Sequence, residues 1–333
     1  EHPLEVINVC KAVLTKYPRA VRSVLTRVCF EELRSVTGRL FSIEPVRRDV
    51  PNPNTVLNQM IDAYFRPDWS TISDEFNRQP ISYDAKLTAD WLSKRPGANA
   101  ILKEMITWLE GEILNKPIND VNVHIKLEAL LKEEPIMSWK QQQSRIIVWQ
   151  SKAIAAIFSP VFLEAKKRLK TILSDKVIYA DGLTPQQLSA RFGNVKSKGV
   201  YLFEDDLTKQ DRQTDEPILV VERMVYELLG VSKSLLDTWF LVHRTWRFKG
   251  KHTRGVLDFM RMTGQVTTAL GNLITNLQVH SKFYSDHKQQ LLLLVMLGDD
   301  NLAVFDGKPD CSQVRSHIAA FYNMQSKNQL YKN

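Results

Sequence analysis

The spacing of apolar positions divides the chain into a mostly helical first part and a mixed second part. Apolar residues recur at helical spacing over 19–40 and 98–115, which predicts two amphipathic helices. Between them, residues 49–54 contain two prolines and two asparagines. These residue types favour turns, so we expect the helical pattern to be interrupted there.

The pattern changes near residue 121. Residues 121–126 and 145–149 predict two short strands on either side of a basic loop, and 153–173 predict a helix that breaks at Pro160. A further helix is expected to begin at Thr184-Pro185, because threonine caps helices and proline suits the first helical position, with Gln187 completing the cap.

Strands and helices alternate in the second half. Residues 199–203 predict a strand that runs into the acidic residues 204–206, and 219–229 predict an amphipathic helix that ends at Gly230. Another helix is expected over 264–283. The apolar stretch Leu291–Leu297, the tripeptide Gly-Asp-Asp and the apolar residues 302–305 predict a β-hairpin with an acidic turn.

The composition is that of a folded protein with a basic excess. The chain has 333 residues, of which 44% are hydrophobic, and 45 Lys+Arg against 37 Asp+Glu give a net charge of +8. This balance excludes wholesale disorder. We find no signal-like start, no apolar run near the roughly 20 residues of a membrane span and no cysteine framework, which together predict a soluble intracellular chain. The basic excess permits a polyanionic partner, although a solvated face is the simpler explanation of the basic stretch at 126–170.

Asp299 and Asp300, in the predicted turn, are the first candidate for chemistry. Two carboxylates beside apolar strands are costly unless a cation lies between them, and Mg²⁺ binds carboxylate oxygens together with substrate phosphates. The alternative is a plain turn, because glycine and aspartate both favour turns.

Two further groups of residues extend this candidate site. Asp206 at a strand end could complete a two-metal site, in which one ion activates a hydroxyl and the other stabilises a leaving pyrophosphate; the alternative is a cap for the following turn. Thr268 and Asn272 share one helix face because they lie four residues apart. A hydroxyl and a carboxamide suit recognition of a ribose 2′-OH, whereas small residues also serve close helix packing.

The order and spacing of these residues resemble the RNA-dependent RNA polymerases of positive-strand RNA viruses. Residues 145–160 are similar to motif F of the alphavirus-like supergroup, close to the bromovirus type, and 322–327 to motif D. The amino-acid sequences of residues 205–215 and 261–265 are most similar to those of endornavirus polymerases. The residues that match are Asp206 and Asp211 in motif A, Thr263, Gly264, Thr268 and Asn272 in motif B, and Gly298, Asp299 and Asp300 in motif C.

The resemblance implies an α+β right-hand polymerase fold, with an antiparallel palm sheet, helices packed on it and largely helical fingers. Residues 1–190 would form the fingers, with motif F at about 126–160. Residues 191–333 would form the palm with motifs A to D, interrupted by a fingers insertion at about 219–255. The chain stops shortly after motif D, so we expect the thumb to be absent and the chain to be a fragment of a longer polyprotein.

The resemblance also implies a function: RNA-directed synthesis of RNA from nucleoside triphosphates, in viral genome replication and transcription. Asp206, Asp299 and Asp300 would bind Mg²⁺, with Mn²⁺ as the alternative ion, and Lys327 would donate a proton to pyrophosphate. The incoming nucleotide and its ribose would contact Asp211, Thr263, Gly264, Thr268 and Asn272. Arg145 and Lys152 would clamp the triphosphate, since both side chains bind phosphate, and Lys126 and Lys140 would line the RNA channel.

The implied partners are the RNA template, the nascent RNA, ribonucleoside triphosphates and other replicase domains, namely a helicase and a methyltransferase. The implied location is the host cytoplasm, with membrane association through the parent replication complex. Two alternatives stay open. The chain could be an inactive RNA-binding or scaffolding fragment of a viral replicase, or a reverse transcriptase. Asn272 with Asp211 argues against the second, because this pair suits a 2′-OH.

Overall fold

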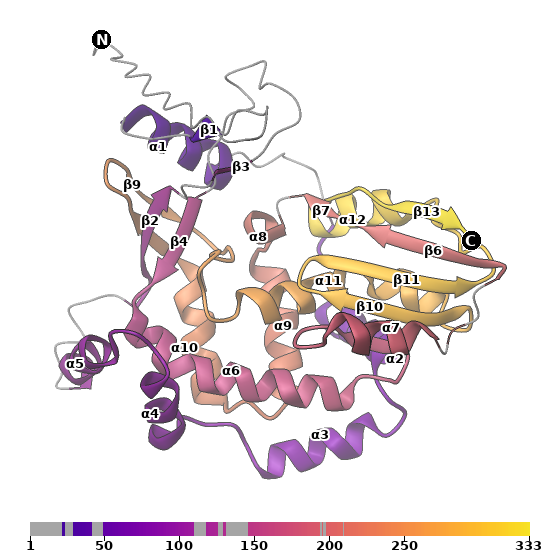
Figure 1. The fold of residues 1–333 in the computed structure, drawn as a ribbon, viewed down its shortest axis with the longest axis horizontal. Helices are drawn as coiled ribbons and strands as arrows, with labels where there is room; N and C mark the ends of the chain where they lie inside the picture. Colours follow the sequence, from indigo (N-terminus) through magenta and orange to yellow (C-terminus); the bar gives the residue numbers. More distant parts are fainter. Residues whose placement is uncertain are drawn as a thin grey trace, which may run out of the picture.

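The computed structural model describes residues 22–23, 29–41, 49–109, 118–125, 129–130, 146–193, 195, 198–208 and 210–333. Three predicted site residues, Lys126, Lys140 and Arg145, lie outside these ranges. The described elements include two larger sheets, one at each end of the long helix α6 (Lys152–Ile172), as Figure 1 shows, and two two-stranded sheets.

The larger sheet has five strands in the order β13-β6-β11-β10-β5. Neighbouring strands are antiparallel except β5, which runs parallel to β10. The prediction of an antiparallel sheet is therefore right for four strands and wrong for the fifth. A parallel pair needs a long crossover connection, which no local pattern reveals. The strands are β5 (Val177–Tyr179), β6 (Val200–Asp205), β10 (Leu291–Leu297), β11 (Asp300–Asp306) and β13 (Gln329–Lys332).

The predicted hairpin is confirmed, and its register decides where the carboxylates lie. Leu297 pairs with Asp300 at the closed end of β10 and β11. On its other side β11 pairs with β6, where Asn301 lies opposite Asp205. Since Asp206 directly follows β6, this register brings it to the same end of the sheet as the acidic turn (298–300).

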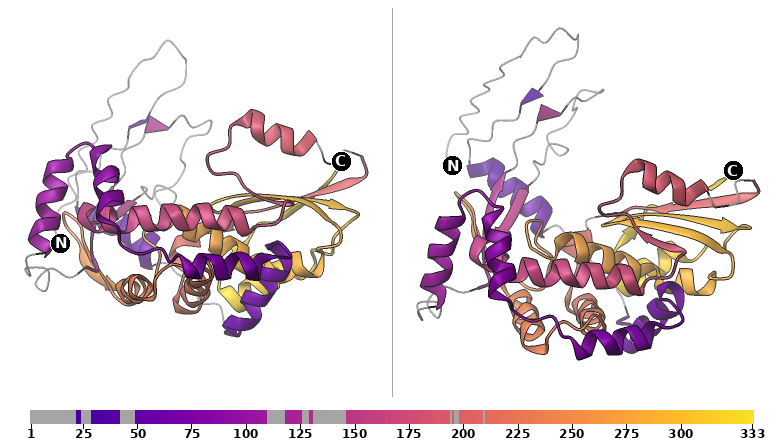
Figure 2. Two further views of the ribbon diagram at one scale, coloured as in Figure 1. Left: turned by 90° about the horizontal axis from the view of Figure 1, so that it is seen from below. Right: turned by 60° about the horizontal axis from the view of Figure 1, so that its bottom comes forward.

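Helices cover both faces of this sheet. The long helix α11 (Thr268–Asp286) lies against one face together with α2 (Pro53–Tyr64) and α9 (Glu216–Leu228), and α7 (Pro185–Gly193) lies over the other (Figure 2). Buried aromatic side chains from β6, α11 and β11 pack against one another between α11 and the sheet, namely Phe203, Phe283, Tyr284 and Phe305. Aromatic residues of this size dominate the energetics of a core.

The smaller sheet has the strand order β4-β2-β8-β9. Its strands are β2 (Asp120–Ile125), β4 (Ile146–Gln150), β8 (Trp246–Lys249) and β9 (Arg254–Leu257). The two strands predicted near 121 and 145 are thus confirmed as β2 and β4. One face packs around the fully buried Trp246. Helices α4 (Ala85–Ser93), α5 (Ala98–Leu109) and α10 (Lys233–Arg244) lie near it, and α3 (Trp69–Arg78) follows α2.

Three element predictions need correction. The helix expected over 19–40 is shorter: Arg22–Ser23 form β1, paired with β3 (Ala129–Leu130), and the helical part is α1 (Cys29–Val36) followed by the π-helical turn η1 (Thr37–Phe41). The helix α6 does not break at Pro160, because burial of its apolar face outweighs one lost backbone hydrogen bond. The helix α11 begins at Thr268 rather than Gly264.

The expected start of α7 is confirmed in detail. The Thr184 N–H donates to Oε1 of Gln187 over 2.9 Å, and the Gln187 N–H donates to Oγ1 of Thr184 over 3.2 Å. This reciprocal pair is a capping box. The remaining short elements are β7 (Leu207–Thr208), α8 (Gln210–Gln213), α12 (Val314–Tyr322) and β12 (Gln325–Ser326).

Within the described ranges, no helix combines the length and the apolar character that crossing a membrane requires. The division of the chain at residue 190 and the insertion at 219–255 stay predictions.

Candidate active site

A cavity of about 730 Å³ lies between the two sheets, on the side of the acidic turn. Its walls come from η1, β4, β7, α8 and the segment before α11. This volume falls in the range typical of small-molecule sites. Of the residues predicted from the sequence, those that line the cavity are Asp206, Asp211, Thr263, Asp299 and Lys327.

The carboxylates of Asp206, Asp299 and Asp300 lie close enough to influence one another. Burial raises the pKa of Asp300, and the negative charges of Asp299 and Asp206 raise it further. In the part of the chain that the structure describes, however, no three His, Cys, Asp or Glu side chains converge tightly enough to hold a metal ion. The chemistry of the donor set fits a hard divalent cation, since carboxylate oxygens are its preferred ligands and its charge would offset their repulsion.

Lys327 is brought to Asp206 by the pairing of β12 with β7. The Lys327 N–H donates to the Asp206 backbone carbonyl over 3.0 Å, and Nζ of Lys327 lies 3.4 Å from Oδ2 of Asp206. Both side chains are about 60% exposed, at 61% and 62%, so their attraction is screened by water. The ammonium is therefore placed at the carboxylate where it can compete with a cation or serve as a proton donor.

The acidic turn is held from behind by Asn276 of α11. Nδ2 of Asn276 donates to the Asp299 carbonyl over 2.7 Å, and its Oδ1 accepts a hydrogen bond from Nδ2 of Asn301 over 3.1 Å. Asn276 is fully buried. The sequence analysis missed this residue, although its position four residues after Asn272 puts both on one helix face.

The strand end before Asp206 is anchored in the same way. Oδ2 of the buried Asp205 contacts Nε2 of His280 at 2.8 Å and accepts a hydrogen bond from Oγ of Ser326 over 2.7 Å. His280 also lies on α11. One helix therefore fixes both the end of β6 and the turn after β10, which sets the spacing of the carboxylates in front of it.

Asp211 and Asn272 form a second polar pair beside the cavity. Nδ2 of Asn272 donates to Oδ1 of Asp211 over 2.8 Å. Burial raises the pKa of Asp211, which this hydrogen bond and the positive charge of Arg261 partly counteract. Oδ1 of Asn272 is buried and has no hydrogen-bond partner among the described residues. This acceptor is therefore unused within the described structure, although Asn272 itself is not part of the cavity wall.

The loop before α11 is bonded to β4. The Val148 N–H donates to Oγ1 of Thr263 over 3.0 Å, and the Gly264 N–H donates to the Val148 carbonyl over 2.7 Å. A Cβ atom on Gly264 would lie 2.8 Å from that carbonyl oxygen, so only glycine permits this approach. The predicted motif B loop and motif F strand are therefore one structural unit.

The hydroxyl of Thr268 is used within the protein. Oγ1 of Thr268 donates to the Met262 carbonyl over 2.6 Å and accepts a hydrogen bond from the Gln265 N–H over 3.1 Å. It shapes the turn into α11, and a contact with the ribose stays a prediction for this residue.

The basic residues are distributed differently from the expectation. Lys152 is exposed at the start of α6 and is not part of the cavity wall. Lys166 and Lys170 both contact Asp181, and Arg168 donates to backbone carbonyls, so this part of the basic stretch serves the fold. Three arginines that the sequence analysis did not predict as site residues, Arg39, Arg212 and Arg261, line the cavity instead. Nothing in the local sequence marks them, because they come together only in the fold.

Comparisons with known proteins give a consistent result. A protein family described as RNA dependent RNA polymerase matches residues 46–332. The replicase large subunit of Odontoglossum ringspot virus (isolate Singapore 1) is 27% identical over 288 residues, and the replicase polyprotein 1ab of Beet yellows virus (isolate Ukraine) is 27% identical over 242 residues. The replicase large subunit of Youcai mosaic virus is 30% identical over 186 residues.

These relatives are much longer than the chain. The three alignments cover 83%, 69% and 54% of the chain but only 17%, 7% and 12% of the respective relatives. The resemblance to polymerases of the alphavirus-like supergroup is confirmed. The finer likeness to endornaviruses stays a prediction.

Proposed function

This chain belongs to the RNA-dependent RNA polymerase family, and on that premise we propose that it transfers nucleotides from ribonucleoside triphosphates to RNA under the direction of an RNA template. The observation that carries the proposal is the register of β6 with β11. It brings Asp206 to the acidic turn, and Asp206, Asp299, Asp211 and Lys327 line one cavity.

Asp206 and Asp299 would hold divalent ions in a two-metal arrangement, with Asp300 assisting from the start of β11. When bound, such ions supply the charge that activates an attacking hydroxyl and stabilises the leaving pyrophosphate. Mg²⁺ is the proposed ion and Mn²⁺ the alternative. Lys327, 3.4 Å from Asp206, would donate a proton on the pyrophosphate side.

Residues in the cavity wall and directly beside it would bind the nucleotide. Asp211 and Asn272 would contact the ribose, since the free Oδ1 of Asn272 can accept a hydrogen bond from a 2′-OH. Thr263 and Gly264 would hold the loop in place through β4. Arg212, on α8 directly after Asp211, and Arg39 are suited to the triphosphate because guanidinium groups bind phosphate in bidentate fashion. The roles predicted for Arg145, Lys126 and Lys140 stay predictions. Lys152 lies outside the cavity wall, so the proposal assigns the triphosphate to the arginines rather than to Lys152.

The RNA template, the nascent RNA and further replicase domains are the proposed partners. The long relatives support additional domains in the parent protein. A location on membranes in the host cytoplasm belongs to the same proposal.

Primer extension on an RNA template, with and without Mg²⁺, tests the proposal. We expect the chain to incorporate ribonucleotides only with the ion, and Asp206→Asn and Asp299→Asn each to abolish incorporation. Asp74→Asn, on the exposed side of α3, is the matched control and should behave as wild type. Incorporation at the wild-type rate by both site variants would overturn the two-metal assignment.

The same assay separates the alternatives. Salt-dependent RNA binding without any incorporation would identify an RNA-binding or scaffolding fragment, an alternative that the loose spacing of the acidic side chains keeps open. A preference for deoxyribonucleotides would identify a reverse transcriptase.

A further inference from the structure

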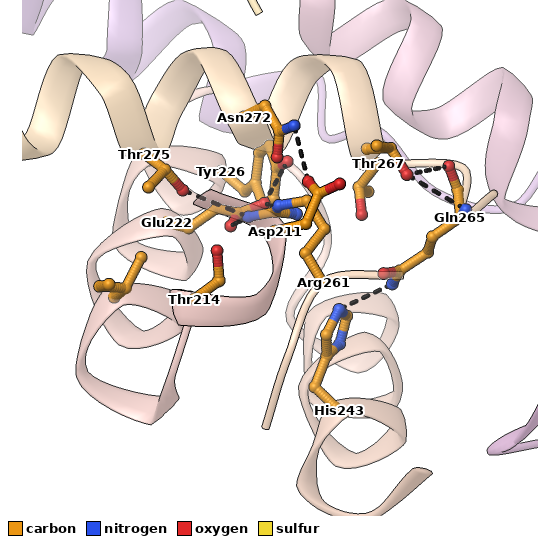
Figure 3. A network of polar contacts seen from close by, with 12 residues as sticks. Asp211, Thr214, Glu222, Tyr226, His243, Arg261, Gln265, Thr267, Asn272 and Thr275 are labelled. Carbon is orange, nitrogen blue, oxygen red and sulfur yellow. Dashed lines mark hydrogen bonds and ion pairs between the residues drawn. The ribbon is translucent and has the colours of Figure 1, made fainter. Parts of the chain in front are cut away.

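An ion pair between Arg261 and Glu222 is completely buried (Figure 3). Arg261 is also one of the residues that border the cavity, whereas Glu222 is not. Nη2 of Arg261 contacts Oε2 of Glu222, and Nη1 lies 3.3 Å from Oε1. Tyr226 donates to Oε1 of Glu222 over 2.8 Å, and Nη2 of Arg261 lies 3.4 Å from Oγ1 of Thr275. Burial opposes the charge on Arg261, but Glu222 more than compensates and raises the pKa of Arg261.

Such a pair is an expensive way to stabilise a core, because apolar residues of the same volume usually do as well or better. Its place in the fold indicates what else it does. Glu222 comes from α9, Arg261 from the segment before the motif B loop, and both side chains lie against α11. The pair therefore joins three elements that meet behind Asp211.

Arg261 acts on Asp211 in two ways. The backbone N–H of Arg261 donates to the backbone carbonyl of Asp211 over 3.1 Å, which fixes the backbone of α8. Its positive charge favours the ionised carboxylate of Asp211, whereas burial opposes that form. Gln210 adds a further bond, from Nε2 to the Asn272 carbonyl over 2.7 Å, so α8 is tied to α11 at the ribose pair itself.

Gly271 shows that α11 accommodates the ion pair. A Cβ atom at residue 271 would come within 2.6 Å of Oε1 of Glu222 and closer still to the Arg261 guanidinium. The guanidinium thus lies flat on the helix directly before Asn272. Any movement of the pair would be transmitted to both partners of the Asp211–Asn272 hydrogen bond.

We infer that Glu222 and Arg261 are positioning residues for ribose recognition: the buried ion pair holds Asp211 and Asn272 in the geometry that discriminates a ribose from a 2′-deoxyribose. This inference deepens the proposed function and rests on it, since it assigns the Asp211–Asn272 pair to the nucleotide. Because both side chains are fully buried, we assign neither of them a contact with the nucleotide.

The test is the ratio of binding affinities for ATP and 2′-deoxyATP, measured by calorimetry in Mg²⁺ on the whole chain. We expect wild type to prefer ATP. Glu222→Gln and Arg261→Lys should each lower this preference roughly fivefold, which corresponds to the loss of one net hydrogen bond. Arg223→Gln is the matched control. It removes ion pairs with Glu227 of the same helix and with Asp237 of α10, and should leave the ratio unchanged.

A double variant, Glu222→Leu with Arg261→Met, covers the case in which the single variants fail to fold. Apolar replacement of both partners preserves packing, so the melting temperature should stay close to that of wild type while the ATP preference is lost. A merely structural ion pair would leave the preference intact in this folded double variant, and that result would overturn the inference.

The result of this affinity test can be distinguished from the result of the primer-extension test of the proposed function. Template-directed incorporation tests the polymerase activity, and the affinity ratio tests the positioning role. An inactive chain whose ATP preference still depends on the ion pair would refute only the activity. A wild-type chain without any preference for ATP would refute the inference even if it incorporates nucleotides.

Discussion

The side-chain amide of Asn276 donates a hydrogen bond of 2.7 Å to the backbone carbonyl of Asp299. A residue of helix α11 thereby fixes the backbone of the acidic turn, which carries the candidate metal ligands. Through Asn301 the same side chain is connected to the backbone carbonyl of Asp205, directly before Asp206. The two carboxylates of the proposed site thus share one buried support.

Replacing Asn276 by alanine should weaken both the fold and the site. The Asp299 carbonyl and the Asn301 amide would lose their partner in a buried place, at a cost of about 2 kcal/mol in the free energy of unfolding. The turn would also become less fixed, so half-maximal nucleotide incorporation should need more Mg²⁺. Urea unfolding and a Mg²⁺ titration measure the two effects. Asn54→Ala, exposed on α2, should change stability by no more than about 0.5 kcal/mol; equal behaviour of the two variants would refute the support role.

Replacing Gly264 by alanine should separate the motif B loop from β4. The new Cβ atom would lie 2.8 Å from the Val148 carbonyl oxygen and 3.0 Å from Cβ of Trp149, and relief of such overpacking costs typically ~1–3 kcal/mol. We expect a lower midpoint in urea and a higher KM for nucleotides. Gly193→Ala is the control, because its Cβ would meet nothing within 4 Å, and it should be neutral or slightly stabilising. A wild-type KM in Gly264→Ala would show that the loop is not held through β4.

Replacing Lys327 by methionine should lower the rate of incorporation and also lower the Mg²⁺ concentration needed for the half-maximal rate. Loss of the proton donor should slow incorporation by roughly a hundredfold. Loss of the ammonium 3.4 Å from Oδ2 of Asp206 removes a competitor for the carboxylate, so less Mg²⁺ should be needed for half-maximal rate. Both quantities come from one Mg²⁺ titration of the extension rate, with the exposed Lys308→Met as control. A slower enzyme that also needs more Mg²⁺ would contradict the competition.

His243 should make stability depend on pH. It is buried between the Trp239 carbonyl and the Gln265 amide, at 2.7 Å from each, and burial lowers the pKa of His243 to about 3. The unfolded chain binds a proton below its ordinary pKa of about 6.5, whereas the folded chain does not until about pH 3. The stabilising contribution is therefore complete above pH 6.5 and falls as the pH decreases.

Between pH 7 and pH 5 this group should remove about 2 kcal/mol from the free energy of unfolding. Urea unfolding at the two pH values measures the loss, which should be smaller by that amount in His243→Gln. His124→Gln, at an exposed position of β2, should keep the wild-type pH dependence. If His243→Gln shows the same loss as wild type, His243 is not held neutral in the fold.

Local patterns predicted the elements that carry the carboxylates of the proposed site. Leu291–Leu297 is apolar throughout and is followed by a glycine turn, so the hairpin could be derived from strand and turn preferences alone. The capping box at Thr184 and Gln187 was likewise visible, because its two hydrogen bonds join residues three apart in sequence. The prediction that the helix breaks at Pro160 was wrong for the opposite reason. Apolar residues that are distant in sequence pack against the helix and keep it continuous.

The supports of the site were not derivable in this way. Asn276 was overlooked although its helical spacing from Asn272 is visible, and no spacing links Glu222 to Arg261 or Arg212 to the cavity, because these residues come from elements that meet only in the fold. The parallel partner β5 belongs to the same class, as more than a hundred residues separate it from β10.

The sequence by itself determined the kinds of element, the order of the acidic and polar motifs along the chain and the family to which they belong, because hydrophobic period and turn chemistry act over a few residues. Only the tertiary structure decided that Asp206 and Asp299 line one cavity, that Asp211 accepts a hydrogen bond from Asn272 and that a buried ion pair lies close to Asn272. These relationships depend on strand register and side-chain packing between distant segments, and the free energies of such contacts are set by burial, which exists only once the chain has folded.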